Sequence, residues 1–131
     1  MSGGFVVVTA CDKRYIPLEK PLKKQALALL SLVKQKRSSF DVFLVTSRVM
    51  RKNVLAFPHP AGFPYPEQNR TYLGEIYLNP SYIRNHSEDL SYMLIHGLLH
   101  LLGYDHKKRN DRIAMEETEA LLYTKLQQLQ L

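Results

Sequence analysis

The chain has 131 residues, 45% of them hydrophobic, which fits one compact domain built around a single core. Its single cysteine, Cys11, excludes an internal disulfide and a cage of thiolate metal ligands, and no apolar run reaches the roughly 18 residues of a membrane span. The net charge of +6 favours a polyanionic partner, most simply a nucleic acid, although solubility alone would also explain it.

The first third of the chain predicts two strands separated by a helix. Residues 5–9 (FVVVT) form a short β-branched run, which is typical of a strand. Pro21 suits the first turn of a helix, and apolar residues recur from there to Val33 at helical spacing, with lysines on the other side. Residues 40–46 alternate and are rich in valine and phenylalanine. We therefore expect a second strand there, with the amphipathic helix packed on the sheet.

The middle of the chain predicts two more strands around a long loop. Residues 47–52 form a short basic connection, and residues 53–57 (NVLAF) read as a third strand closed by Pro58. Residues 58–66 contain four prolines and one glycine, which predicts a surface loop. Residues 72–78 (YLGEIYL) read as a fourth strand, in which Gly74 indicates a bulge or close approach by another backbone.

The last third predicts three helices. Asn79 and Pro80 start a short helical piece that ends near residue 85, and Ser87 is the expected N-cap of the next helix. That helix runs to about Leu102 and is apolar nearly all round, which is typical of a central, buried helix. A final helix begins near residue 110. Its expected apolar stripe consists of Ile113, Leu121, Leu122 and Leu126. We expect one domain, residues 1–131, of α/β (α+β) class.

Three of the five histidines lie within one short segment, residues 93–106 (MLIHGLLHLLGYDH). His96 and His100 are one helical turn apart, so both imidazoles project from one face of the central helix. Gly103 can end that helix in the left-handed conformation, and His106 follows far enough on to fold back. The spacing therefore predicts an open tripodal metal site on a central helix and the following turn. Zinc accepts such a site and keeps a fourth position for water.

Other readings of the histidines and of Gly97 are also open. A single histidine on an apolar helix is more often a core residue, and His59 and His86 read as ordinary surface residues. A zinc protease carries its general-base glutamate where this chain has Gly97, so peptide hydrolysis by that mechanism is not expected. Gly97 could leave space for substrate beside the metal, or it could only allow close packing of the helix on the sheet, and the two readings are compatible.

Four polar residues are further candidates for the site. Asp105 could orient a ligand imidazole or simply stabilise the turn. Glu75, inside an apolar strand, needs a partner or a function if it faces the core, whereas alternation could place it outward. A guanidinium of Arg48 or Arg51 near the metal could hold a phosphate and offset charge in the transition state, with surface solvation as the alternative.

At this point the sequence resembles the YbeY family, the metal-dependent endoribonucleases of ribosomal RNA maturation. Residues 96–106 (HGLLHLLGYDH) match the signature of that family, and residues 53–58 (NVLAFP) and 73–78 (LGEIYL) match two further blocks. Met115 and Glu119 also correspond. The resemblance extends over about residues 40–123. The chain departs mildly from the family pattern at two positions: it has Glu75 where members often have Asp, and Ala56 where they often have Ser.

The resemblance implies a fold, a metal and an activity. The fold is a four-stranded mixed sheet packed with helices, with a positively charged groove beside the metal. One zinc ion per chain is held by His96, His100 and His106. The activity is cleavage of single-stranded RNA, in maturation of the 3′ end of small-subunit ribosomal RNA and in ribosome quality control. The family also has an important arginine upstream of the NVLAFP-like strand. Arg48 is the first choice for its counterpart and Arg51 the second.

We therefore predict a cytoplasmic zinc-dependent endoribonuclease whose catalytic residues are Arg48, His96, His100 and His106. Its expected partners are ribosomal RNA and the small ribosomal subunit, with no membrane and no nucleotide cofactor. Two alternatives remain: a metal-dependent hydrolase of another substrate, and a ribosome-assembly factor that binds RNA around a non-catalytic metal. Residues 107–109 (KKR) could add salt-sensitive affinity for an RNA backbone, or they could be only a solvated charge run.

Overall fold

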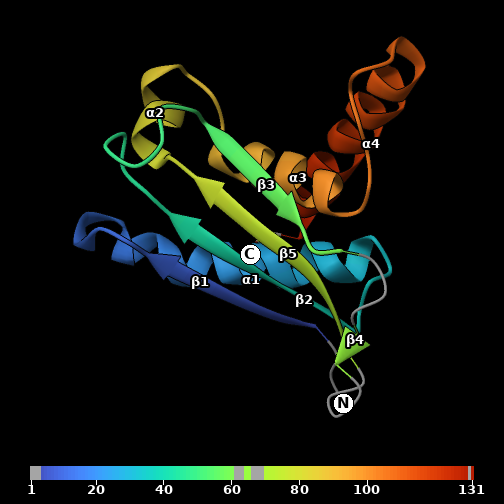
Figure 1. Cartoon of the computed structure of the whole chain (residues 1–131), viewed down its shortest axis with the longest axis horizontal. Coiled ribbons are helices and arrows are strands. Elements are labelled where there is room, and N and C mark those ends of the chain that lie inside the picture. Colours follow the sequence, from blue (N-terminus) through green and yellow to red (C-terminus); the bar gives the residue numbers. More distant parts are fainter. Residues whose placement is uncertain (1–3, 61–63, 66–69, 130) are drawn as a thin grey trace.

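A mixed β-sheet with helices on one face is the framework of the molecule in a computed structural model, which describes residues 4–60, 64–65, 70–129 and 131 (Figure 1). Four strands lie in the order β1-β2-β5-β3, and a two-residue strand, β4, pairs with β5. This confirms the predicted four-stranded mixed sheet. The strands are β1 (Phe5–Ala10), β2 (Ser38–Leu44), β3 (Val54–Pro58), β4 (Pro64–Tyr65) and β5 (Arg70–Leu78).

The strand directions follow from the connections. A helix joins β1 to β2 and the two strands are parallel; β2 and β5 are also parallel, whereas β3 runs antiparallel to β5. Strand β2 begins two residues before its predicted start, at Ser38. The predicted loop at residues 58–66 contains β4, and its residues 61–63 and 66 lie outside the described residues.

Both predictions for Gly74, a bulge and close approach by another backbone, are confirmed in β5. The register of β2 against β5 shifts between Ser39 and Phe40, so β5 carries one extra residue at this point. Gly74 has a φ of +137°, and an added Cβ would lie 2.3 Å from the carbonyl oxygen of Phe57 on β3. A side chain at this position would therefore collide with the neighbouring backbone.

Two helices cover the inner face of the sheet, and a third packs across them. Helix α1 contacts β1, whereas α3 contacts β3 and β5, and α4 packs against both α1 and α3. Leu29, Phe40, Ile76 and Leu98 are fully buried between these layers. The helical elements are the 3-10 helix η1 (Lys13–Leu18), which was not predicted, α1 (Glu19–Leu32), α2 (Pro80–Asn85), α3 (Leu90–Leu101) and α4 (Arg109–Gln128).

The N-cap of helix α3 is Asp89, two residues after the predicted cap, Ser87. Ser87 instead takes a left-handed φ of 58° in the turn that ends α2, where its N–H donates to the carbonyl of Arg84. Asp89 is the observed N-cap, and its carboxylate accepts from the backbone N–H of Tyr92 at 3.0 Å. Ser87 therefore belongs to the turn between α2 and α3, and Asp89 caps α3 in its place.

The predicted apolar stripe of α4 is half correct. Leu122 and Leu126 are buried, but Ile113 and Leu121 are 42% and 55% exposed. The residues that face the core are spaced at four, three and four along the helix, and they include a carboxylate: Met115, Glu119, Leu122 and Leu126. Among the described residues, no helix combines the length and the apolar character needed to cross a membrane.

Candidate metal centre

Three imidazoles converge at the C-terminal end of α3, as the sequence predicts. One ring nitrogen of each of His96, His100 and His106 can be chosen so that all three lie within 4.8 Å of one another. The Nε2 atoms of His96 and His100 are 3.2 Å apart. Two ligand nitrogens on a tetrahedral zinc ion are about 3.3 Å apart, given Zn–N bonds of about 2.0–2.1 Å. The donor set and its spacing therefore fit a zinc ion.

The end of α3 brings His106 back toward the other two rings. Gly103 has a left-handed φ of +98°, and the N–H of Tyr104 donates to the carbonyl of Leu99 at 2.9 Å. This is the hydrogen-bond pattern of a glycine-ended helix. Asp105 accepts from the backbone N–H of Lys107 at 3.0 Å, so the turn-stabilising reading of Asp105 is the one observed.

The carboxylate that orients an imidazole is Glu119, which the sequence reasoning did not assign to the site. Its Oε2 lies 2.5 Å from Nδ1 of His96, and its Oε1 accepts from the hydroxyl of Tyr92 at 3.3 Å. Glu119 is only 4% exposed. A carboxylate in this position favours the proton on Nδ1 and leaves Nε2 of His96 free to bind a metal. The available signal was a charged residue on the buried stripe of α4.

The surroundings of His100 favour its neutral, metal-binding form. Burial lowers the pKa of His100 below its ordinary value of 6.5, and the neighbouring His96 and His106 lower the pKa further. A hydrogen bond with the backbone of Tyr104 and the charge of Asp105 raise the pKa, but they are smaller effects than burial. Because only a neutral imidazole can coordinate, this environment prepares His100 as a ligand near neutral pH.

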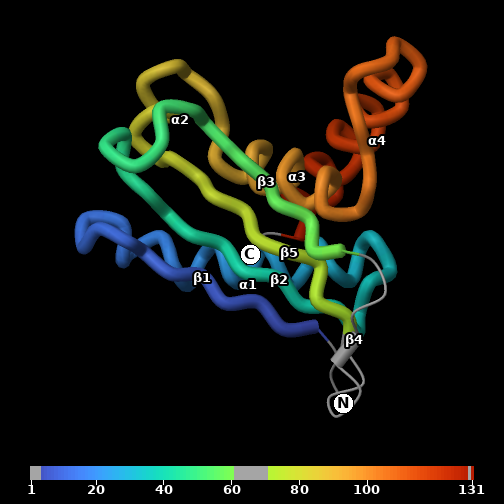
Figure 2. The backbone as a smooth tube through the Cα atoms, viewed as in Figure 1, coloured from blue at the N-terminus to red at the C-terminus, as the bar shows by residue number. Residues whose placement is uncertain are grey.

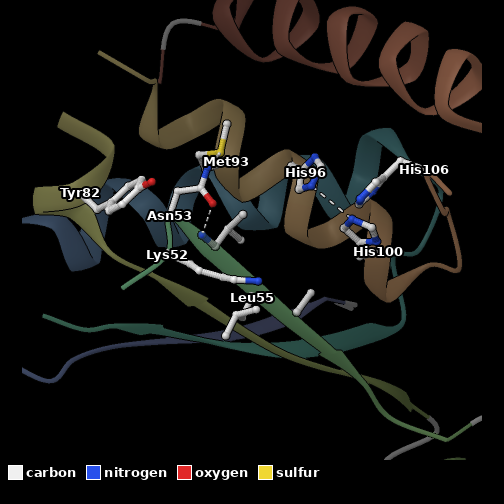
Figure 3. A pocket seen from close by; sticks show the side chains of 10 residues that line it. Lys52, Asn53, Leu55, Tyr82, Met93, His96, His100 and His106 are labelled. Carbon is white, nitrogen blue, oxygen red and sulfur yellow. Dashed lines mark hydrogen bonds between the residues drawn. The ribbon is translucent and has the colours of Figure 1, made fainter. Parts of the chain in front are cut away.

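The histidines line one end of a cavity of about 500 Å³ between α3, β3 and α2 (Figure 3). Its opposite end is formed by Tyr82, with Lys52 and Asn53 between the two ends. The cavity is larger than a phosphate group requires and lies in the range of ligand-binding pockets. Its lining residues are Lys52, Asn53, Val54, Leu55, Ala56, Tyr82, Met93, His96, His100 and His106.

Gly97 serves close packing and does not open space beside the three histidines. It is buried, and an added Cβ would lie 2.8 Å from Cγ2 of Ile76 on β5. The reading in which Gly97 makes room for substrate is therefore wrong. Because Gly97 has no side chain, α3 can approach the sheet closely. A glycine also cannot act as a general base.

Neither of the predicted arginines lines this cavity. Arg48 lines a second cavity, of about 480 Å³, together with Arg14 and Ser81, and Arg51 lines neither of the two. Lys52, the next basic residue, is the cation that lines the histidine cavity. Glu75 lies half-buried on the outer face of the sheet, where its carboxylate accepts from the hydroxyl of Tyr77 at 3.2 Å.

Comparison with known proteins agrees with the resemblance in the motif. Residues 31–127 match the family model described as Endoribonuclease YbeY. The protein named Endoribonuclease YbeY in Ehrlichia chaffeensis is 34% identical, over 69% of this chain and 68% of that protein. The proteins of the same name in Ehrlichia canis and Nitrobacter hamburgensis are 44% and 36% identical, over 49% and 56% of this chain. These matches span 47% and 44% of the two relatives, or about half their length. The chain belongs to the Endoribonuclease YbeY family.

Proposed function

We propose that this protein is a zinc-dependent endoribonuclease that cleaves single-stranded RNA. The observation that carries the proposal is the convergence of His96, His100 and His106 in one cavity. The positively charged side chain of Lys52 lines the same cavity. Three histidines with no fourth ligand from the described residues are typical of a catalytic zinc site, whereas structural sites usually have four protein ligands. The curated relatives named above carry an endoribonuclease name, which supports the same activity.

Each residue of the site has a separate task in this proposal. His96, His100 and His106 hold the zinc ion, and Glu119 keeps the proton of His96 on Nδ1 so that Nε2 faces the metal. A zinc ion held there would supply the Lewis acidity that hydrolysis of a phosphodiester requires. Lys52 offers a positive charge at the cavity wall, where it would attract the RNA backbone. Gly97 leaves the protease mechanism without its base.

The role of Arg48 stays a prediction. It was expected to bind the scissile phosphate, but it lines the second cavity with Arg14 and does not line the histidine cavity. We propose that Arg48 contacts the RNA backbone at a phosphate other than the one cleaved. Lys52 is then the better candidate for the phosphate nearest the metal.

The finer parts of the function come from the family resemblance. We propose that the RNA substrate is ribosomal, that cleavage matures the 3′ end of small-subunit ribosomal RNA, and that the protein acts in the cytoplasm and in ribosome quality control. The positive net charge of the chain supports a polyanionic partner of this kind. The small ribosomal subunit is the proposed partner.

An RNA cleavage assay tests the proposal. Purified protein is stripped of metal with a chelator, refilled with zinc, and incubated with a single-stranded RNA beside a His100→Ala variant whose folding is checked by circular dichroism. We expect cleavage only from the refilled wild type. Cleavage that survives both chelation and the substitution would indicate a contaminating nuclease. Intact RNA binding without any cleavage would favour the RNA-binding assembly factor instead.

A further inference from the structure

We propose that the Tyr82 end of the histidine cavity binds one unpaired RNA base by stacking, an inference that rests on the proposed function. Tyr82 comes from α2, and it lines the same cavity as the three histidines of α3 and its following turn. Figure 3 shows the ring of Tyr82 at the opposite end of this cavity from the imidazoles. The cavity thus has a metal-binding end and an aromatic end.

The ring of Tyr82 is held in place before any ligand arrives. It stacks on the ring of His86, with centroids 3.7 Å apart and planes at 11°, and Nδ1 of His86 is 2.8 Å from the carbonyl oxygen of Tyr82. We call this pair the Tyr82–His86 stack; in it the imidazole of His86 covers one face of the tyrosine ring. A base that stacks on such a fixed ring loses little affinity to the ordering of the protein.

A buried amide fixes the backbone under this stack. The side chain of Asn79 accepts from the N–H of Tyr82 at 3.0 Å and donates to the carbonyl of Met50 at 2.8 Å, and Asn79 is fully buried. The second bond ties α2 to the loop between β2 and β3, which runs beside α2 in Figure 2. Lys52 belongs to this loop, so the aromatic end and the cation are linked through the same contact.

The chemistry between the two ends suits a nucleotide. The walls contributed by Val54, Ala56 and Met93 are apolar, and Lys52 supplies the positive charge. A flat base would therefore meet apolar groups and an aromatic ring, while its phosphate would lie between Lys52 and the histidines. Base–aromatic stacking of this kind is largely independent of sequence, because every base has a π-face.

The amide of Asn53, which lines the cavity between its two ends, already hydrogen-bonds to the protein. The amide nitrogen of Asn53 donates to Glu88 at 3.0 Å, and its oxygen accepts from the N–H of Val54 at 2.7 Å. Asn53 is therefore poorly placed to read the edge of a base. The inferred site selects an unstacked base, not a particular sequence, which would give preference for single-stranded RNA close to the cleaved bond.

Equilibrium binding tests the inference separately from catalysis. The zinc-loaded protein is titrated into a short fluorescent 2′-O-methyl RNA single strand, whose intactness is checked afterwards, and anisotropy is recorded. We expect Tyr82→Ala to weaken binding by about 5- to 140-fold, the range for loss of one base–aromatic stack. Tyr82→Phe should bind like the wild type. A matched control is Phe43→Ala, which removes a ring that stacks on Tyr77 on the outer face of the sheet, with centroids 5.0 Å apart.

An abasic scan identifies the stacked base. With one base removed at the contacted position, wild type and Tyr82→Ala should bind the strand equally weakly, whereas at other positions their difference should persist. Equal binding by wild type and a folded Tyr82→Ala variant would overturn the inference, even if zinc-dependent cleavage were observed. Conversely, failure of the cleavage assay would refute the proposed nuclease activity without removing a stacking effect measured here.

Discussion

Nδ1 of His96 lies 2.5 Å from Oε2 of Glu119, so a buried carboxylate on α4 contacts a proposed zinc ligand on α3. The hydroxyl of Tyr92 donates to the other carboxylate oxygen. Burial raises the pKa of Tyr92, and the negative charge of Glu119 raises it further. Tyr92 therefore stays a hydrogen-bond donor at physiological pH. The imidazole of this proposed ligand is thus oriented from α4 as well as from its own helix.

Removing the charge of Glu119 should weaken zinc binding. We expect Glu119→Gln to lower zinc affinity by about 10- to 100-fold, because a neutral amide no longer favours the Nδ1-protonated form of His96. Competition with a chromophoric chelator measures the affinity without reference to activity. Glu117→Gln, an exposed substitution on the same helix, is the matched control. Equal zinc affinities for both variants and the wild type would show that the Glu119 contact does not orient the ligand.

Alanine at position 97 should destabilise the fold. The added Cβ would lie 2.8 Å from Cγ2 of Ile76, and overpacking of this kind costs about 1–3 kcal/mol, which outweighs the gain of up to about 1 kcal/mol in helix propensity. Urea unfolding measures the free energy. The double variant with Ile76→Ala should lose less than the sum of the two single variants, because the second change removes the colliding atom. A strictly additive result would contradict the contact.

Lys52 should contribute to the salt dependence of RNA binding. Replacing it with alanine is expected to lower the slope of log K against log salt concentration by about 0.7, the value for loss of one phosphate contact on a single strand. Titrations of single-stranded RNA at several salt concentrations give the slope. Lys125→Ala, an exposed change on α4, should leave it unchanged. A similar decrease with Arg48→Ala would support a second phosphate contact at the other cavity.

His100 should titrate below its ordinary pKa in the metal-free protein. Burial and the neighbouring imidazoles lower the pKa of its folded form below 6.5, so the unfolded chain binds more protons once the pH falls below about that value. The free energy of unfolding should therefore decrease as the pH falls from about 6.5 toward the lower pKa of folded His100. A His100→Ala variant should lack the part of this decrease that comes from His100. Imidazole resonances in an NMR titration measure the pKa directly. A value at or above 6.5 would contradict the described environment.

Much of the fold could be predicted because local signals and burial agree. The β-branched run at β1, the glycine at the end of α3 and the spacing of His96 and His100 each point to the observed structure. The start of α3 was missed because Ser87 and Asp89 are both good caps, and the choice depends on how α2 ends.

The missed parts of the site depend on contacts between distant segments. The contact of Glu119 with His96 joins residues 23 apart, and it becomes visible only when α4 packs on α3. Likewise, Lys52 and Arg48 are close in sequence but line different cavities, and the loop that carries them is hydrogen-bonded to Asn79. A pattern of charges cannot distinguish such neighbours.

X-ray absorption at the zinc edge, together with elemental analysis, tests the account most directly. We predict one zinc ion per chain, with about three nitrogen ligands at about 2.0–2.1 Å and one further light atom that does not come from the protein. Replacing His106 with alanine should remove the metal or reduce the nitrogen count by one. A shell filled by four protein ligands, or zinc binding that is unchanged in the His106 variant, would contradict the open three-histidine site.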